Sequence, residues 1–378
     1  MNKKTIVLIT GNPLNHEGGM VAFNKGLIST LNATKKKYKL LHFSIGSRMF
    51  FFYSPILKRI VYPFILGFDL IRLFFILFKK NIKIIQHNPS LIPVPLIRDG
   101  LAQLINTIIF KKKSVIVLHG WKEHIYKKIV ENKFYRYLIV KFFNSADVVY
   151  VLSEEFKSKL YELGVSKFKI SVTTTFFYKR DIKTTFRQKP KPDKIKFIYL
   201  GRVSKIKGIG ELIEAFSKVK KKRKDFICEI IGHGDKPKTL QYFEKKVIEK
   251  KLEDNIKFLG QITGEEKFDL LSQSDIYIFP SYMEGCPTSV IEALATGLFV
   301  ISTDVGALND IINKDNGIKV KPKEIDSLAR AIIFSMKNIM ILRSKQRGIY
   351  ENSNHKFEVK KIAKQFHISY EHLIKLTL

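Results

Sequence analysis

The sequence has few cysteines: only Cys228 and Cys286 occur in a chain of 378 residues. They fall in different predicted elements, so a disulfide framework is not expected, and a reduced, intracellular compartment is favoured. An apolar signal region with a cleavage pattern is also missing, since two lysines lead directly into a predicted strand at Thr5–Thr10. We therefore expect a cytoplasmic protein without an export signal.

Acidic residues are scarce as well. The chain holds 34 Asp and Glu against 67 Lys and Arg, and its formal net charge is +33, with the first half the more basic. Such a field attracts nucleic acid, anionic membranes or phosphorylated substrates, and charge alone does not choose among them. No zinc-finger spacing or aromatic RNA-binding motif is present, so a basic nucleic-acid-binding protein is an alternative that rests on charge alone.

The order of the predicted elements indicates the fold class. With 45% hydrophobic and 27% charged residues the chain is globular, and its length suggests two domains. Short apolar strands such as Ile82–Gln86 and Ser114–Leu118 alternate with helices such as Glu154–Leu163. This order is typical of an α/β protein with parallel, doubly wound sheets.

A polar, basic and proline-bearing segment marks the expected domain boundary. It covers residues 181–194 and separates a predicted domain over residues 1–180 from one over residues 195–355. A last helix at about 356–378 is expected to pack back on the first domain.

The most apolar segment is Ser54–Lys80. Asp69 and Arg72 interrupt it, and each would cost about 3 kcal/mol at the centre of a bilayer, so we expect no membrane span. Two interpretations remain: a buried helix pair broken near Pro63 and Gly67, or an interfacial helix that dips into a membrane. Basic flanking residues favour the second: Lys58, Arg59, Lys79 and Lys80.

The segment 281–297, SYMEGCPTSVIEALATG, is the part most suited to carry chemistry. It predicts a tight loop after a strand and then a helix from Thr288, with Pro287 in its first turn. Glu284 is expected in the loop at the carboxyl end of the strand, where ligands bind in open α/β sheets. Glu292 is expected on the helix with its carboxylate free for a ligand. Taken singly, either glutamate could be an ordinary surface residue.

Cations and glycines add to this pattern. Arg202 and Lys207 occupy a predicted strand-to-helix loop, GRVSKIKG, where two cations suit a diphosphate. In so lysine-rich a chain, a pair of cations also arises by chance. Two glycine pairs allow the backbone to approach a ligand, Gly18-Gly19 and Gly232 with Gly234.

A histidine ends one of the predicted strands of the first half. His119 lies where ligand contacts are made, and its imidazole suits a sugar hydroxyl or a phosphate. A structural role fits the same spacing.

In this order and spacing, GRVSKIKG, IIGHG, FLGQIT and PSYMEGCPTSVIEALATG resemble glycosyltransferase family 4, whose members are retaining enzymes of the GT-B fold. The resemblance is good over residues 196–320 and looser in the first half, through GGM, the His119 strand and ADVVYVLSEEF. It implies two Rossmann-like, doubly wound domains facing across a cleft. The first would be the acceptor-side domain, and the second would bind the nucleotide sugar.

The resemblance also implies roles for single residues. Arg202 and Lys207 would hold the diphosphate in place of a metal ion, Glu284 would lie beside the donor sugar, and Glu292 would bind the ribose hydroxyls. The implied catalytic residues are Glu284, His119, Arg202 and Lys207. The implied donor-binding residues are Gly18, Gly19, Arg202, Lys207, Gly232, Gly234, Gly285, Cys286, Pro287, Thr288, Ser289 and Glu292. No cofactor is expected, and a UDP-sugar is the favoured donor.

The implied function is retaining transfer of a hexosyl or N-acetylhexosaminyl group to a saccharide acceptor. The apolar segment and the basic first half lead us to expect a polyprenyl-linked acceptor at the inner face of the cell membrane, in synthesis of O-antigen, capsule or a similar cell-surface polysaccharide. A GT-B-fold nucleotide-sugar epimerase is a rival, against which the paired glutamates argue. A non-catalytic relative that keeps the fold is another rival, which the presence of four charged residues disfavours: Arg202, Lys207, Glu284 and Glu292.

Overall fold

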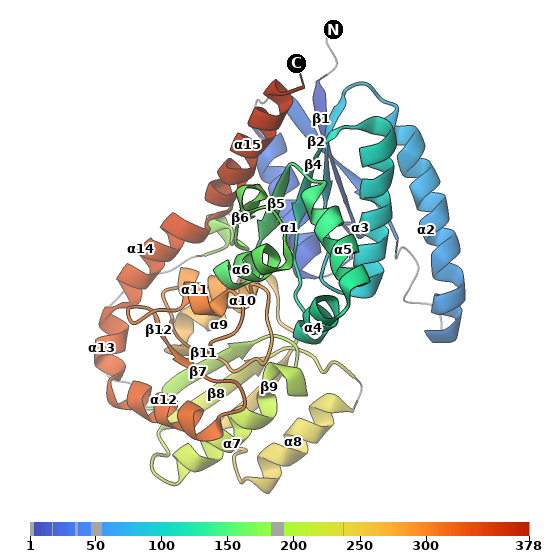
Figure 1. The fold of residues 1–378 in the computed structure, drawn as a ribbon. Coiled ribbons are helices and arrows are strands. Elements are labelled where there is room, and N and C mark those ends of the chain that lie inside the picture. The colour runs from blue at the N-terminus through green and yellow to red at the C-terminus, as the bar shows by residue number, and fades with distance from the viewer. Residues whose placement is uncertain are drawn as a thin grey trace. The chain divides into compact units, whose positions relative to one another are not determined.

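The computed structural model describes residues 4–16, 18–34, 37–46, 55–182, 193–236 and 238–377, without the side chains of Pro55, Ile56, Lys58 and Arg59. Most of the predicted linker and the basic flank at Lys58 and Arg59 therefore lie outside what is described. The chain divides into two compact units, one of residues 1–174 with 359–378 and one of residues 175–358 (Figure 1).

The first unit is built on a parallel sheet of six strands in the order β2-β1-β3-β4-β5-β6. Its strands are β1 (Thr5–Gly11), β2 (Tyr38–Ser44), β3 (Ile82–His87), β4 (Lys113–Val117), β5 (Val148–Val151) and β6 (Ile170–Val172). Strands β1, β3 and β4 are rich in Val and Ile that are wholly buried, as expected for a parallel sheet covered on both faces.

Helices cover both faces of this sheet. They are α1 (Gly19–Asn32), α2 (Pro55–Leu77), α3 (Pro93–Ile105), the π-helix η2 (Asn106–Phe110), α4 (Glu123–Glu131), α5 (Lys133–Asn144), α6 (Glu154–Leu163) and α15 (Val359–Lys375). Strand β2 lies on one side of β1, and β3 to β6 follow on the other. Right-handed crossovers therefore put α1 on one face of the sheet and α2, α3 and α5 on the other (Figure 1). Helix α1 packs against α15, α2 against α3, and α3 against α5.

The apolar segment forms one helix, α2, so one of the two interpretations, a helix pair broken near Pro63 and Gly67, was wrong. Pro63 removes one backbone hydrogen bond, but Leu66, Leu73 and Leu77 anchor the helix in the core of the unit. Residues 60–77 are long and apolar enough to cross a membrane by length and composition alone. The buried leucines show that one side of α2 belongs to the domain.

The second unit has a parallel sheet in the order β12-β11-β10-β7-β8-β9. Its strands are β7 (Ile195–Leu200), β8 (Phe226–Ile231), β9 (Ile256–Gly260), β10 (Ile276–Phe279), β11 (Phe299–Thr303) and β12 (Gly317–Val320). Its helices are α7 (Ile209–Lys220), α8 (Thr239–Glu249), α9 (Gly264–Gln273), α10 (Thr288–Ala295), α11 (Leu308–Ile311), α12 (Ile325–Lys337), α13 (Ile339–Ser344) and α14 (Gln346–Phe357). Neighbours β8, β7 and β10 end at one edge, which brings together the loops that follow them.

Candidate functional site

Backbone contacts hold these three loops against each other. The Tyr282 amide donates to the Ile206 carbonyl at 2.9 Å, which joins the loop after β10 to the loop after β7. The Val203 amide donates to the His233 carbonyl at 2.8 Å, which joins the loop after β7 to the loop after β8. The Arg202 carbonyl accepts from the Tyr199 hydroxyl at 2.9 Å. The loops thus form one assembly at the edge of the sheet.

The centre of this assembly is an ion pair between Lys207 and Glu284. Lys207 lies in a short 3₁₀ turn, Lys205–Lys207, and its Nζ is 2.5 Å from Glu284 Oε1. The two side chains are only 18% and 9% exposed, and the ammonium lies 5.5 Å from the centre of the Phe279 ring. A charge-assisted hydrogen bond so poorly solvated fixes both groups. Arg202, in the same loop, has an exposed side chain.

A second ion pair involves Glu292 on α10. Its carboxylate was expected to be free, but Lys267 on α9 donates to its Oε1 at 2.7 Å. The Glu292 side chain is 15% exposed. Burial raises the pKa of Glu292, and the nearby Lys267 partly offsets this rise. Nothing in the sequence linked Lys267 to Glu292, because the two residues lie on different helices.

The remaining predicted donor residues line the same edge. Helix α10 begins at Thr288, and Pro287 is its N-cap, one position earlier than predicted. The Gly285 carbonyl accepts from the Ala307 amide at 2.9 Å, and the buried Cys286 thiol lies 3.2 Å from the Thr175 hydroxyl. Ser289 hydrogen-bonds the buried Tyr277 hydroxyl, which itself donates to the Leu200 carbonyl. Gly234 pairs with Val203 in an isolated bridge, and Gly232 packs on Gly201.

In the first unit, Gly18 and Gly19 lie exposed at the start of α1, and Gly18 has a φ of +130°. A Cβ built at either position meets no atom within 4 Å. The pair therefore leaves space around the helix start.

His119 lies at the carboxyl end of β4 in a hydrogen-bond network whose directions are fixed. Asn88 Nδ2 donates to the Thr10 carbonyl at 2.8 Å, so Asn88 Oδ1 is the group that faces His119. Gln86 Nε2 and His119 Nε2 approach this oxygen at 3.2 Å and 3.0 Å. The Tyr370 hydroxyl of α15 donates to Gln86 Oε1. Because a carbonyl oxygen only accepts, His119 must carry its proton on Nε2.

This tautomer leaves Nδ1 of His119 as an acceptor. Among the described residues Nδ1 has no hydrogen-bond partner. Burial lowers the pKa of His119 to about 3, and burial lowers the pKa of His87, on the neighbouring strand, to about 4. The imidazole of His119 is therefore neutral at physiological pH. Asn88, which orients it, was not among the predicted residues.

Comparison with protein-family models gives a match within the second unit. Residues 181–355 match the family model "Glycosyl transferases group 1". We call the part of the chain that matches this model the group 1 domain.

Relatives of the group 1 domain extend the likeness. The chain is 32% identical over 181 residues to a protein of Bacillus subtilis described as a teichuronic acid biosynthesis glycosyltransferase, TuaC. That alignment covers 48% of this chain and 43% of TuaC, so the chain spans less than half of that relative. It is 28% identical over 325 residues to an uncharacterized glycosyltransferase of Methanocaldococcus jannaschii, MJ1069, covering 80% of both chains.

Solved structures match the chain over nearly its whole length. Sucrose-phosphate synthase of Thermosynechococcus elongatus gives a TM-score of 0.79 at 18% identity, covering 99% of this chain and 100% of that one. Anabaena HepE in complex with UDP and glucose gives 0.72 at 14% identity, covering 97% and 100%. These likenesses confirm the predicted α/β class and the GT-B fold, with the group 1 domain as its second half.

Gly208, within the group 1 domain, tests how tightly the loops pack. It has a φ of +74°, and a Cβ there would lie 2.0 Å from the Pro280 carbonyl oxygen. Gly208→Ala should lower the free energy of unfolding by more than about 3 kcal/mol, since both strain and overlap act against it. Gly210→Ala is the matched control, because its Cβ meets nothing closer than 3.8 Å. Equal melting temperatures for the two variants would contradict this packing.

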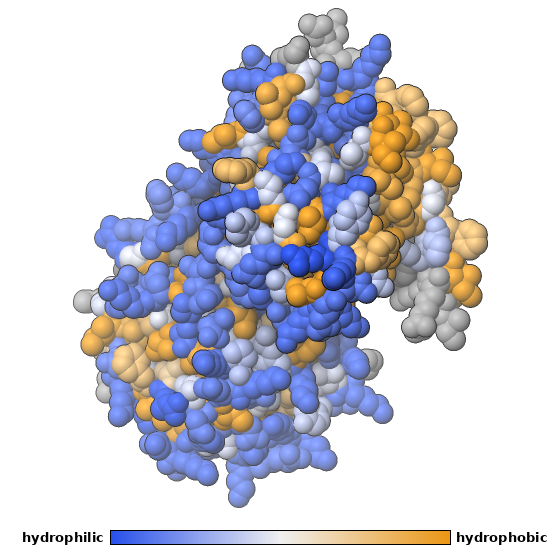
Figure 2. All heavy atoms as spheres, in the orientation of Figure 1, coloured by the Kyte–Doolittle hydropathy of each residue, from blue (hydrophilic) through white to orange (hydrophobic). Residues whose placement is uncertain are grey.

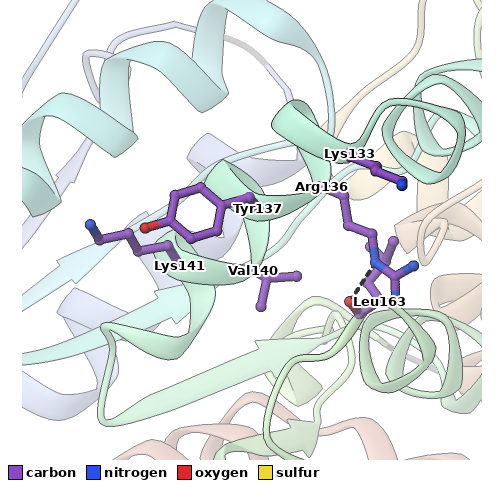
Figure 3. A pocket seen from close by; sticks show the side chains of 6 residues that line it. All are labelled: Lys133, Arg136, Tyr137, Val140, Lys141 and Leu163. Carbon is purple, nitrogen blue, oxygen red and sulfur yellow. Dashed lines mark hydrogen bonds between the residues drawn. The ribbon is translucent and has the colours of Figure 1, made fainter.

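A groove of about 350 Å³ lies outside the group 1 domain, between α5 and α6 of the first unit (Figure 3). Its lining is largely apolar, with cations around it: Lys133, Arg136, Tyr137, Val140, Lys141 and Leu163. Arg136 Nε donates to the Leu163 carbonyl at 2.9 Å. None of the predicted donor residues lines this groove.

Proposed function

We propose that the protein transfers a sugar, with retention of configuration, from a nucleoside diphosphate sugar to a saccharide acceptor. The observation that carries this proposal is the poorly exposed Lys207–Glu284 pair, in a loop that also holds Arg202, at the strand ends of residues that match the group 1 glycosyltransferase model. Cations at this edge suit a diphosphate, and a carboxylate beside them suits the hydroxyls of the sugar attached to it.

In this proposal each side chain of the candidate site has a defined role. Lys207 and Arg202 bind the diphosphate and stabilise the charge that develops on it as it leaves, without a metal ion. Glu284 holds the Lys207 ammonium in place and lies beside the donor sugar. Lys267 occupies Oε1 of Glu292, and we assign Oε2 to the ribose hydroxyls. The unprotonated Nδ1 of His119 accepts a hydrogen bond from a sugar hydroxyl.

The transfer step follows from these roles. The acceptor hydroxyl attacks the anomeric carbon from the side of the leaving group. Its oxygen forms the new bond to that carbon while the bond from the carbon to the diphosphate oxygen breaks. The acceptor's proton passes to the departing diphosphate. No side chain needs to act as a nucleophile, which is consistent with the ion pair that Glu284 already forms with Lys207.

For the acceptor we propose a lipid-linked saccharide at the cytoplasmic face of a membrane, in cell-surface polysaccharide synthesis. Two observations support this choice: TuaC is described as acting in teichuronic acid biosynthesis, and α2 exposes a row of large apolar side chains. For the donor we favour a UDP-sugar, since HepE was solved with UDP and glucose.

A thermal-shift screen tests the donor site directly. We expect metal-independent stabilisation by one of the nucleotides UDP, GDP, ADP and CMP, and a ligand at 100 times its Kd contributes about 2.7 kcal/mol. Lys207→Ala should lose this shift, and Lys205→Ala, in the same turn, should keep it. No shift with any nucleotide, together with salt-dependent binding of nucleic acid, would favour the nucleic-acid-binding alternative. A sugar converted without any acceptor would favour the epimerase.

A further inference from the structure

Helix α3 is built with its polar side inward. Apart from Ala102, the residues that it buries are polar, namely Arg98, Asp99 and Gln103, and Asn106 at the start of η2 is buried as well. The residues that it exposes are apolar, and η2 continues the row: Val94, Ile97, Leu101, Leu104, Ile108 and Ile109. A helix on the surface of a water-soluble domain shows the opposite arrangement. Polar side inward and apolar side outward is the arrangement of a helix in contact with lipid.

Hydrogen bonds keep the polar side of α3 inward. Arg98 pairs with Asp99 at 2.7 Å, and Gln103 Nε2 donates to the hydroxyls of Ser114 and Ser145 at 2.9 Å and 3.0 Å. At the start of η2, Asn106 Nδ2 donates to the Lys112 carbonyl at 2.9 Å. The apolar side therefore cannot rotate inward without breaking a satisfied buried network.

Helix α2 adds a second apolar row beside the first. Its exposed side chains recur at helical spacing, and Phe78, directly after its last residue, continues the row: Ile60, Phe64, Phe68, Ile71, Phe75 and Phe78. The rings of Phe74 and Phe78 lie 5.4 Å and 5.1 Å from that of Phe110, which ties the end of α2 to η2. We call the exposed apolar side chains of α2, α3 and η2 the α2–α3 face. A broad apolar area covers these helices in Figure 2.

The charges around the α2–α3 face are almost all positive. Helices α2, α3, η2 and α5 contain two carboxylates, Asp69 and Asp99, and both are fully buried beside arginines. Exposed cations lie at the ends of α2 and η2 and around the groove of α5: Lys79, Lys80, Lys111, Lys133, Arg136 and Lys141. An apolar centre with a cationic rim, on four helices that expose no carboxylate, complements an anionic bilayer.

We propose that the α2–α3 face inserts into the acyl boundary of an anionic membrane, with the surrounding lysines and arginines on the lipid headgroups. Helix α3 begins at Pro93, shortly after Asn88, so the inserted surface lies close in the chain to the strand end that carries the His119 network. A saccharide attached to a lipid would reach this strand end from the membrane. This last step rests on the proposed function, whereas the insertion does not.

Vesicle sedimentation tests the insertion with the full chain. Wild type should bind vesicles of phosphatidylethanolamine and phosphatidylglycerol, and binding should persist in part at about 0.5 M salt, where charge is screened. Ile108→Asp and Phe75→Asp should each lower the partition onto vesicles by about tenfold. Matched controls are Ile248→Asp on α8, 60% exposed against 64% for Ile108, and Phe168→Asp in the 3₁₀ turn Lys167–Lys169; both should bind like wild type.

Three results would overturn the insertion. One is vesicle binding that high salt abolishes completely and that Ile108→Asp leaves unchanged, since this means attraction by charge alone. Another is a wild-type dimer in sedimentation velocity that Ile108→Asp makes monomeric while neither binds vesicles, since this means a contact between copies. The third is no vesicle binding by a folded, monomeric wild type. Vesicle binding without any nucleotide-induced thermal shift would retain the insertion and refute the proposed function.

Discussion

Glu284→Gln should lower the rate of sugar transfer about a thousandfold and leave nucleotide binding at or above the wild-type level. The substitution keeps the shape of the side chain and a hydrogen-bond acceptor for Lys207, 2.5 Å away, but it removes the negative charge. Lys207 then presents a less neutralised ammonium to the diphosphate, which favours binding. Transfer suffers because the amide no longer orients the donor sugar or supports positive charge at its anomeric carbon.

The partner variant separates binding from transfer. Lys207→Ala should weaken nucleotide binding by at least about 100-fold, because it leaves the nearly buried Glu284 carboxylate unpaired beside the diphosphate. Lys205→Ala serves as the control, since it removes an exposed cation from the same turn. Calorimetry with the nucleotide that gives the thermal shift measures binding, and product formation measures transfer. Unchanged turnover in Glu284→Gln would refute the role of this carboxylate.

The Lys207–Glu284 pair shows what the sequence could predict. Both residues follow strands whose apolar composition marks them as parallel and central, and parallel strands end at a common edge. Loops after such strands must therefore meet, although 77 residues separate the two side chains. Their direct contact needed the structure, because it depends on the 3₁₀ turn that aims Lys207.

Lys267 and Asn88 show why the rest escaped prediction. Lys267 is one of many lysines, and only the packing of α9 beside α10 selects it as the partner of Glu292. Asn88 acquires its role through three strands and a helix from the far end of the chain, which no local pattern records. For helix α3, hydrophobic periodicity predicts the wrong buried side. Its apolar stripe would be expected to face the core, but in the structure this stripe is exposed.

Two histidines of the first unit, the buried His87 and the half-buried His119, should make this unit sensitive to acid. Burial lowers the pKa of His87 from 6.5 to about 4 and that of His119 from 6.5 to about 3. At a pH between these folded-state pKa values and 6.5, the unfolded chain binds protons that the folded chain does not bind. The free energy of unfolding therefore falls as the pH falls. From pH 7 to pH 4.5 each histidine should contribute a loss of about 2.5 kcal/mol. Urea unfolding measures this through Trp121, the only tryptophan of the chain, which stacks on Phe156.

His119→Gln tests the assignment, because it should remove the share of the loss assigned to His119, about 2.5 kcal/mol. His124→Gln, which changes an exposed histidine of α4, is the matched control and should keep the wild-type pH dependence.

The protonation state of His119 also limits its role in catalysis. A His119 that stays neutral down to about pH 3 cannot donate a proton during transfer at neutral pH, and can only accept a hydrogen bond through Nδ1. If His119→Gln had the same acid dependence as wild type, the pKa of His119 would be the same in the folded and unfolded chain, and the lowered pKa argued here would be refuted.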